Sequence, residues 1–552
     1  MKNRFIEMIA ANFVLILLLL PTNAQNQPAE DVKMLSEGQA ITREISPKQK
    51  HLYKIHLENG QFVKISATST NGVIAVSMFE SDGKFMLDGI TVSSTNDTET
   101  LNAAVRKAGD YQISVTTADK TDGNYRLNIL ELRAATEKEF SYTDGKRIMS
   151  EMEILIKADS SFGNVQIAIK KFQEAIGKFQ FAQAHKAEAV ALDNIGILLT
   201  GLGERRKAIE FHQRSLKIFK AIGDKKNQSY ALNSLGRVYA YLGERQKAIE
   251  ILTESLSLAK EAKNKKTEGI ALNGIGAIYY RLQDAPRAES YHVAALKLFE
   301  EIEDKYNEAI TLNYLGNCVN ENKDYQKAIE YYEKAIGLHK NLPGRQPEPS
   351  YFSNLGRSYF QLGNTDKGFE YLNEALKISQ TQSDKSNEAF FLKTLGEFYL
   401  KLGKLSEAAE YAEKSLEIYR TIEDPTRITK TLYLLTKIKS RLGKTDEAQA
   451  HIEEALNLIE GFRAEMSNNN LRDSFSTTIY DYYSAYIELL MRREKLESDK
   501  KYAELALQAN ERARARGLLN LLTESNIDIR QGVNESLLNK EKRTRKLVDG
   551  KI

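Results

Sequence analysis

The sequence predicts a mainly α-helical protein, a right-handed α-solenoid of helix-turn-helix repeats that is preceded by a small β-sandwich. Three observations lead to this fold class. Glycines recur every 40 residues from Gly196 to Gly396, and short stretches with alternating apolar residues fill the chain before them. The composition of 42% hydrophobic and 28% charged residues excludes the disordered and collagenous classes. A length of 552 residues predicts several packing units.

Charge and cysteine content exclude several classes of function. The 78 Lys and Arg against 75 Asp and Glu leave a net charge of +3, which is too small to indicate a nucleic-acid or membrane-surface protein. Cys318 is the only cysteine. The chain therefore has no intramolecular disulfide, no thiolate zinc cluster and no C-x-x-C redox motif.

Residues 1–24 have the pattern of a secretory signal peptide. Lys2 and Arg4 precede an apolar run over residues 8–20, and a proline and small residues follow before a cut after Ala24. The run is shorter than the roughly 20 apolar residues that a spanning helix needs. We expect an extracytoplasmic protein, periplasmic or secreted, with no membrane span after cleavage.

Residues 30–133 are expected to form the β-sandwich. Tyr53, Ile55 and Leu57 alternate with polar residues such as Lys54, as in half-buried strands. Turn dipeptides that tolerate positive φ punctuate the segment: Asn59-Gly60, Asn71-Gly72, Asp82-Gly83 and Asp122-Gly123.

The phrases ENGQFV at 58–63, AGDYQISV at 108–115 and GNYRLNI at 123–129 resemble the bacterial pre-peptidase C-terminal domain. The resemblance implies an accessory sandwich of exported proteins, without catalytic residues of its own. His51 and His56 are five residues apart on a predicted strand, so they point to opposite faces and we interpret them as surface or edge histidines.

Residues 145–460 are predicted to hold about eight helix-turn-helix units. The repeat glycines are preceded by apolar residues at helical spacing, and a Leu-Gly turn and a second helix with a small alanine follow. We expect each glycine to let the neighbouring helix approach closely. The units resemble tetratricopeptide repeats, and the 40-residue period and the phrase ALNSLG at 231–236 are similar to the subclass of kinesin light chain.

The tetratricopeptide resemblance implies a concave groove lined by the first helices, which binds an extended peptide or protein partner. The positions that it carries over, three before, one after and four after each glycine, contain these candidate binding residues: Asp193, Asn233, Arg237, Asn273, Tyr280, Asn313, Asn317, Asn320, Arg357, Phe360, Lys393 and Glu397.

The asparagines of this set have two interpretations. An amide can donate to a carbonyl and accept from an N–H, so a row of amides suits a peptide backbone. Alternatively, Asn233, Asn273 and Asn313 bridge adjacent helices inside the solenoid. The sequence leaves both interpretations open.

We predict no enzyme, no cofactor, no metal site and no catalytic residue. His212 and His292 lie sixteen residues after their glycines, two repeats apart, and we interpret them as packing histidines. No histidine falls on a first helix next to that of Cys318, so a buried thiol is expected rather than a nucleophile.

Residues 461–525 are predicted to form a helical extension, and residues 526–552 a charged tail. The phrases LRDSF at 471–475, YYSAYIELL at 482–490 and ERARARGLL at 511–519 resemble the region that precedes CHAT domains, which are caspase-like. We therefore expect an exported interaction scaffold that binds a peptide or protein and no nucleic acid. The alternatives are a regulatory part of a CHAT-type protease with its catalytic domain truncated or separate, and a glycan or cell-surface module in the β domain.

Overall fold

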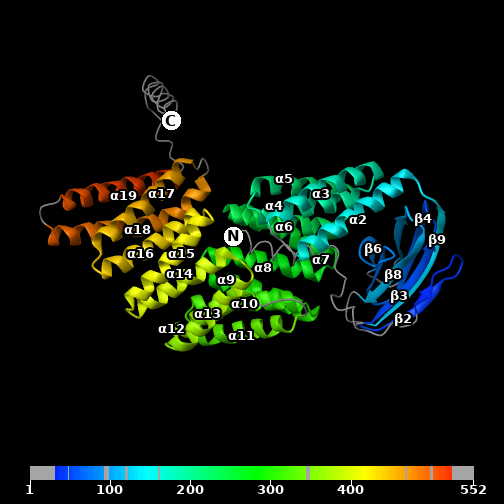
Figure 1. Ribbon diagram of the computed structural model, residues 1–552, viewed down its shortest axis with the longest axis horizontal. Coiled ribbons are helices and arrows are strands. Elements are labelled where there is room, and N and C mark those ends of the chain that lie inside the picture. Colours follow the sequence, from blue (N-terminus) through cyan, green and yellow to red (C-terminus); the bar gives the residue numbers. More distant parts are fainter. Residues whose placement is uncertain are drawn as a thin grey trace, which may run out of the picture. The chain divides into compact units, whose positions relative to one another are not determined.

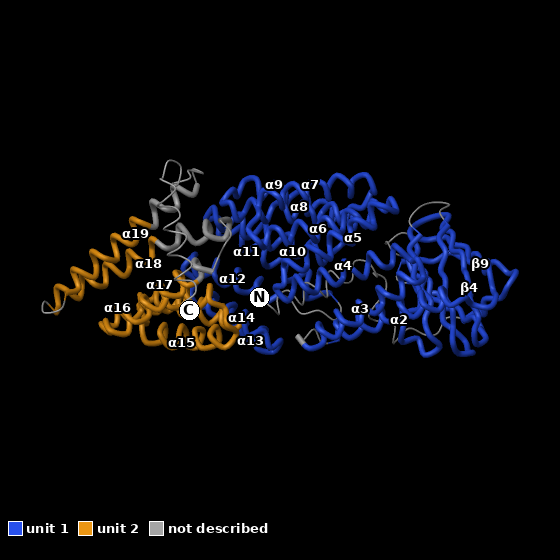
Figure 2. The backbone as a smooth tube through the Cα atoms, turned by 90° about the horizontal axis from the view of Figure 1, so that it is seen from above, with its two compact units in different colours: residues 1–387 blue, residues 388–552 orange. Residues whose placement is uncertain are grey.

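The computed structural model describes residues 32–47, 49–92, 98–117, 122–158, 162–342, 348–465, 469–497 and 501–524. The predicted signal peptide, residues 1–24, and the predicted tail, residues 526–552, lie outside the described residues. The chain divides into two compact units, residues 1–387 and 388–552 (Figure 2).

Nine described strands form two packed sheets at the start of the first unit (Figure 1). One sheet has the order β1-β3-β8-β5-β6 and the other the order β2-β9-β4-β7. The strands are β1 (Lys33–Met34), β2 (Ile41–Ile45), β3 (Lys50–Leu57), β4 (Gln61–Asn71), β5 (Ile74–Phe79), β6 (Met86–Val92), β7 (Thr98–Ala104), β8 (Gly109–Thr117) and β9 (Gly123–Ala134). The predicted β-sandwich ahead of the repeats is confirmed.

The core between the sheets contains a buried polar contact. Tyr125 of β9 is fully buried, and its hydroxyl lies 2.5 Å from the Tyr53 hydroxyl and 2.7 Å from His51 Nδ1. His56, on the opposite face of β3, is exposed and bonds Asp110 at 2.7 Å. The interpretation as surface or edge histidines was wrong for His51, whose side chain is buried. Burial is possible because the Tyr125 hydroxyl supplies a hydrogen-bond partner.

Helix α2 (Glu137–Ala158) packs on the open edges of both sheets. Its Thr143 hydroxyl accepts a hydrogen bond from the Ala104 N–H of β7 at 2.9 Å, and its Ser150 hydroxyl accepts one from the Met86 N–H of β6 at 3.0 Å. The buried carboxylate of Asp88 accepts from Tyr142 at 2.9 Å. These side chains satisfy strand edges that would otherwise be unpaired, so the sandwich and the first repeat helix form one continuous structure.

The first unit continues with consecutive antiparallel helix pairs. After α2 come α3 (Phe162–Ala182), α4 (His185–Gly201), α5 (Arg205–Ala221), α6 (Lys225–Leu242), α7 (Arg245–Glu261), α8 (Lys265–Arg281), α9 (Ala285–Glu301), α10 (Lys305–Glu321), α11 (Tyr325–Lys340), α12 (Pro349–Gln361) and α13 (Thr365–Thr381). The even-numbered helices are the first helices of their repeats, and the odd-numbered ones are the second helices.

The division between the units falls within α14 (Lys385–Lys401). The second unit contains α15 (Leu405–Thr421), α16 (Pro425–Arg441), α17 (Thr445–Glu465), α18 (Asn469–Leu496) and α19 (Tyr502–Glu524). Helices α2 to α17 make eight consecutive pairs, as the 40-residue period predicts. No helix among the described residues has a stretch apolar enough to cross a membrane.

The repeat glycines allow the two helices of a repeat to touch. A Cβ atom added at Gly276 would lie 2.7 Å from Cε1 of His292, and one at Gly196 would lie 2.6 Å from Cε1 of His212. Carbon atoms in van der Waals contact are about 3.5–4.0 Å apart, so no other residue fits without displacing the imidazole. The expected close approach at these glycines is confirmed.

Side-chain caps begin many of the first helices. Asp224, Asp304 and Asp424 each accept a hydrogen bond from the backbone N–H three residues later, at 3.0 to 3.1 Å. These caps satisfy N–H groups that have no partner within the helix. The same local sequence therefore begins the helix in repeat after repeat.

Candidate functional site

The candidate binding residues lie on first helices of both compact units. Those from Asp193 to Phe360 belong to helices α4, α6, α8, α10 and α12 of the first unit, whereas Lys393 and Glu397 belong to α14 in the second unit. Whether any of the twelve residues binds a peptide stays a prediction.

Asp193 is an internal residue of its own repeat. Its side chain is 2% exposed, and Oδ1 lies 2.7 Å from Nδ1 of His212 on α5. His212 is equally buried, which agrees with its interpretation as a packing histidine. Both side chains face the packing of α4 on α5, so Asp193 is not presented to a partner.

The three asparagines at the equivalent position are also buried, at 4% exposure for Asn233 and 7% for Asn273 and Asn313. Asn273 donates to Thr311 Oγ1 of the next first helix at 2.7 Å, and its Oδ1 lies 2.9 Å from His292 Nδ1. This geometry favours the bridging interpretation for Asn273, because both ends of its amide are already bonded to helices.

A network of amides joins α10 to α12. Asn354 Nδ2 donates to Oδ1 of Asn313 and to Oδ1 of Asn317, both at 3.0 Å. Asn317 Oδ1 also accepts from the Tyr332 hydroxyl at 2.8 Å, and Asn320 Oδ1 accepts from the Ser358 hydroxyl at 2.9 Å. The amide oxygens of Asn317 and Asn320 are thus used within the solenoid.

Four of the candidate residues remain accessible or partly accessible on three consecutive first helices: Tyr280, Asn317, Asn320 and Arg357, which we call the donor cluster. They come from α8, α10 and α12. Arg357 is exposed, and among the described residues no carboxylate forms an ion pair with it. Its charge nevertheless acts on Tyr280, whose pKa is raised by burial and by Glu321 and Cys318 and lowered by Arg357.

The donor cluster offers hydrogen-bond donors rather than acceptors. An asparagine whose oxygen is bonded still has two N–H donors on Nδ2, which in Asn317 and Asn320 have no bond to described residues. The guanidinium of Arg357 carries five donors, and a Tyr280 with a raised pKa keeps its hydroxyl proton. Such a set complements an anion that accepts several hydrogen bonds, above all a carboxylate.

Phe360, Lys393 and Glu397 are occupied by contacts within the protein. Phe360 is 9% exposed and packs edge-on against Phe369 of the same repeat, with ring centroids 6.3 Å apart. Lys393 and Glu397 form an ion pair with each other on α14. Arg237 is half-buried on α6. Phe360 therefore packs inside its own repeat.

Sequence reasoning missed Asn354 and Ser358. They lie two residues before and two after Gly356, positions that the resemblance did not mark. The available signal was weak: the position of Asn354 holds Ser234, Gly274 and Tyr314 in the three preceding repeats, but asparagine again in the repeat before those, at Asn194. An amide there can reach the amides of the previous first helix.

The other candidate chemistry has a structural explanation. Burial raises the pKa of the Cys318 thiol to about 12, so the thiol is protonated at neutral pH. Burial lowers the pKa of His292 to about 3, so this imidazole stays neutral. Among the described residues, no three His, Cys, Asp or Glu side chains are placed to hold a metal ion.

Comparison with known proteins identifies the repeats. The family model for the tetratricopeptide repeat matches residues 187–261, 267–341, 349–421 and 389–461. A search of curated protein sequences gives no match.

Several solved structures are similar in fold. One is a signal transduction ATPase with numerous domains (STAND) protein from Pyrococcus horikoshii, which has a tetratricopeptide repeat sensor. It is 16% identical, over 71% of this chain and 55% of that one, with a TM-score of 0.49. A Rap protein complexed with competence and sporulation factor is 14% identical, over 60% and 90% of the two chains, with a TM-score of 0.46. Nearly identical TPR-like repeats from Podosopora anserina, described as a kinesin light chain, are 17% identical over 35% and 96%, with a TM-score of 0.30.

The family match, the 40-residue period and the consecutive helix pairs agree. The expected fold class is confirmed, and the resemblance to tetratricopeptide repeats is confirmed for the part of the chain that the family model covers. Between residues 187 and 461, this chain contains tetratricopeptide repeats arranged as consecutive helix pairs.

Proposed function

We propose that this protein is an exported, non-enzymatic interaction scaffold, and that its donor cluster binds a carboxylate of an extended peptide or protein segment. The observation that carries the proposal is the combination of the exposed guanidinium of Arg357, which has no ion pair among the described residues, with the amide N–H groups of Asn317 and Asn320, which have no bond to described residues. Repeat solenoids of this kind present their first helices as extended binding surfaces.

The internal hydrogen bonds support this role because they orient the donors. Ser358 and Asn354 bond the amide oxygens, so the nitrogen of each amide is turned away from its neighbour on α12. Donors that are already held in place lose less conformational entropy when a ligand binds. Asn273 and Asn313 contribute as supports of the helices rather than as contacts to the partner.

The binding energy expected from such a site is moderate. A hydrogen bond to a charged group contributes about 1.5–3 kcal/mol, and about 1.4 kcal/mol corresponds to a ten-fold change in affinity. Loss of Arg357 should therefore weaken binding by roughly ten-fold or more.

The test uses peptides selected by display on the full chain. For a selected peptide, the affinity of the free carboxylate form is compared by calorimetry with that of the form carrying an amide at the same position. We expect Arg357→Gln to weaken binding of the carboxylate form at least ten-fold and to remove its advantage over the amide form.

Arg214→Gln is the matched control, because Arg214 is also exposed but lies on the second helix α5. It should leave the affinity unchanged. Equal affinity of Arg357→Gln and the parent chain for the carboxylate peptide would show that the donor cluster is not the binding site.

A further inference from the structure

Stacked pairs of tyrosines occur at equivalent positions in three repeats. The residues three and fifteen after the repeat glycine are both tyrosine in three repeats, and their rings stack at interplanar angles of 6° to 13°. The pairs and their centroid distances are Tyr279 and Tyr291 at 5.6 Å, Tyr359 and Tyr371 at 5.5 Å, and Tyr399 and Tyr411 at 5.3 Å.

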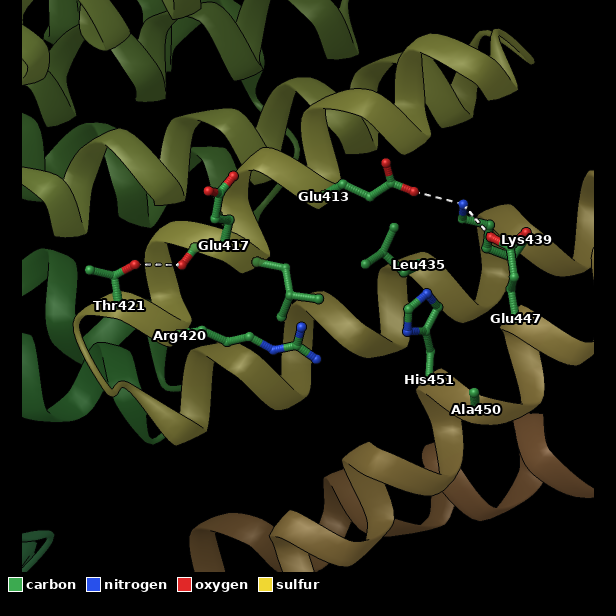
Figure 3. A pocket seen from close by; sticks show the side chains of 10 residues that line it. Glu413, Glu417, Arg420, Thr421, Leu435, Lys439, Glu447, Ala450 and His451 are labelled. Atoms are coloured by element: carbon green, nitrogen blue, oxygen red, sulfur yellow. Dashed lines mark hydrogen bonds and ion pairs between the residues drawn. The ribbon is translucent and has the colours of Figure 1, made fainter.

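The repeat of α16 and α17 is one of the repeats without this pair, and a cavity lies at its position. Its corresponding residues are Lys439 and His451, counted from Thr436, which stands in the place of the glycine. Both line a pocket of about 550 Å³ (Figure 3), which we call the last-repeat pocket. Its lining residues are Glu413, Leu416, Glu417, Arg420, Thr421, Leu435, Lys439, Glu447, Ala450 and His451.

Lys439 occupies the repeat position of Tyr359 and makes an equivalent bond, but its side chain is narrower than a tyrosine ring. Its side chain is 7% exposed, and Nζ bonds Glu413 and Glu447, each at 2.6 Å. The bond to Glu413 corresponds to the bond from the Tyr359 hydroxyl to Glu333, which joins the same two repeat positions at 2.9 Å. A methylene chain in place of a ring leaves ring-sized space beside His451.

Flat groups line that space from two helices. Figure 3 shows Arg420 of α15 and His451 of α17 reaching toward the same region, with Leu435 of α16 beside them. Burial lowers the pKa of His451, and the positive charge of Lys439 lowers it further, so its imidazole is uncharged at neutral pH. Guanidinium and imidazole planes and leucine side chains are surfaces on which an aromatic ring packs well.

The charges of the last-repeat pocket favour a cation. Three glutamates and two basic side chains line it, and Arg420 Nη2 is held by Glu454 with bonds of 2.7 and 2.8 Å. Lys439 is shared by Glu413 and Glu447. Within the described residues the exposed carboxylate of Glu417 has no charged partner, and it is the group free to pair with a ligand.

We propose that the last-repeat pocket binds a ligand that joins an aromatic ring to a positively charged group such as an ammonium. The ring takes the place of the tyrosine that four other repeats supply. It lies between Arg420 and His451, and the cation lies near Glu417. The site belongs to the second unit and is independent of the donor cluster on α8, α10 and α12.

The full chain contains no tryptophan, so an indole probe can be followed by its own fluorescence without background. We expect tryptamine to bind with a dissociation constant on the order of 1 mM. Indole-3-acetate, which has the same ring and the opposite charge, should bind at least ten-fold more weakly. Absence of tryptamine binding, or equal binding of the two probes, would overturn the proposal.

Lys439→Tyr introduces the residue found at this position in four other repeats and should abolish tryptamine binding. Lys437→Tyr is the matched control, because Lys437 is exposed on the same helix and does not line the pocket. It should bind tryptamine as the parent chain does. Unchanged binding by Lys439→Tyr would contradict the assignment of the pocket.

Glu417→Gln tests the charge without touching the packed interior, so it decides the outcome even if Lys439→Tyr does not fold. It should reduce the preference for tryptamine over indole-3-acetate several-fold, and an unchanged preference would contradict the role of Glu417.

Competition by acetyl-Lys-Trp-amide distinguishes the source of the ring. Tighter binding than tryptamine supports a partner protein segment, whereas weaker binding supports a free aromatic amine.

Discussion

Pairs of residues at fixed distances from the repeat glycine determine how each first helix packs on its second helix. The residue three before the glycine and the residue sixteen after it are Asp193 and His212 in one repeat, and Asn233 and Leu252 in the next. Asp193 and His212 bond each other in the interior, whereas Leu252 makes an apolar contact. The two combinations are alternative ways to pack the first helix of a repeat on its second helix.

His212→Leu alone should destabilise the protein by about 3 kcal/mol, because it leaves a buried carboxylate without its partner. Asp193 has no other hydrogen bond to a described side chain. The double change Asp193→Asn with His212→Leu recreates the pair of the next repeat and should recover most of the loss.

Urea unfolding followed by circular dichroism measures both variants. Both variants remove His212 Nε2, which is buried without a hydrogen-bond partner among the described residues, so the difference between them reports on the carboxylate of Asp193. If the double variant were less stable than His212→Leu, the bond between Asp193 and His212 would not be what holds this position.

At the scale of elements, α2 joins two kinds of structure. Its hydroxyl groups accept hydrogen bonds from the edge strands β6 and β7, and its other side packs on α3. Gly145 allows this packing, since a Cβ atom there would lie 2.6 Å from Cε1 of Phe179. One helix therefore completes the sandwich and begins the solenoid.

Thr143→Ala with Ser150→Ala should leave the N–H groups of Ala104 and Met86 without acceptors. An unsatisfied buried group costs about 1–3 kcal/mol. We expect faster hydrogen exchange at these two amides and a lower midpoint of unfolding for the sandwich.

Ser141→Ala is the control on the same helix, because the Ser141 hydroxyl bonds the Lys178 carbonyl of α3 and no strand. It should leave the exchange of the strand amides unchanged. Unaltered exchange in the double variant would show that α2 does not protect the edges of the sheets.

At the scale of the whole molecule, stability is distributed along the chain. The main contacts of the solenoid run between consecutive helices and between first helices of neighbouring repeats. In such arrays each repeat is stabilised mainly by its neighbours, so a local defect is expected to stay local.

Gly276→Ala should destabilise the repeat of α8 and α9 by about 1–3 kcal/mol, because the added methyl group overpacks the space of His292. Hydrogen exchange should become faster in α8, α9 and the adjoining helices and remain unchanged in the strands β3 and β8. Equal acceleration in those strands would contradict the local model.

Gly337→Ala is the matched control for this experiment. Gly337 is also helical, but a Cβ atom there would have no neighbour within 4 Å. Alanine should stabilise this helix by roughly 0.5–1 kcal/mol through its higher helix propensity.

The candidate binding residues show which features of the site the sequence could predict. The spacing placed all of them on first helices, which the structure bears out. It did not separate the buried Asn273 from the exposed Arg357, because both positions lie near the same face of an isolated helix. Burial depends on the side chain that the next repeat places opposite, such as Thr311 against Asn273.

The sequence by itself determined the fold class, the repeat length and the reason for the repeat glycines, because these follow from short-range periodicity. Only the tertiary structure decided which side chains are free to meet a partner. The contact of Asn354 with Asn317 and the opening beside Lys439 arise between helices of different repeats. Hydrogen bonds and cavities depend on atoms brought together across about forty residues of chain, and no local pattern specifies those distances.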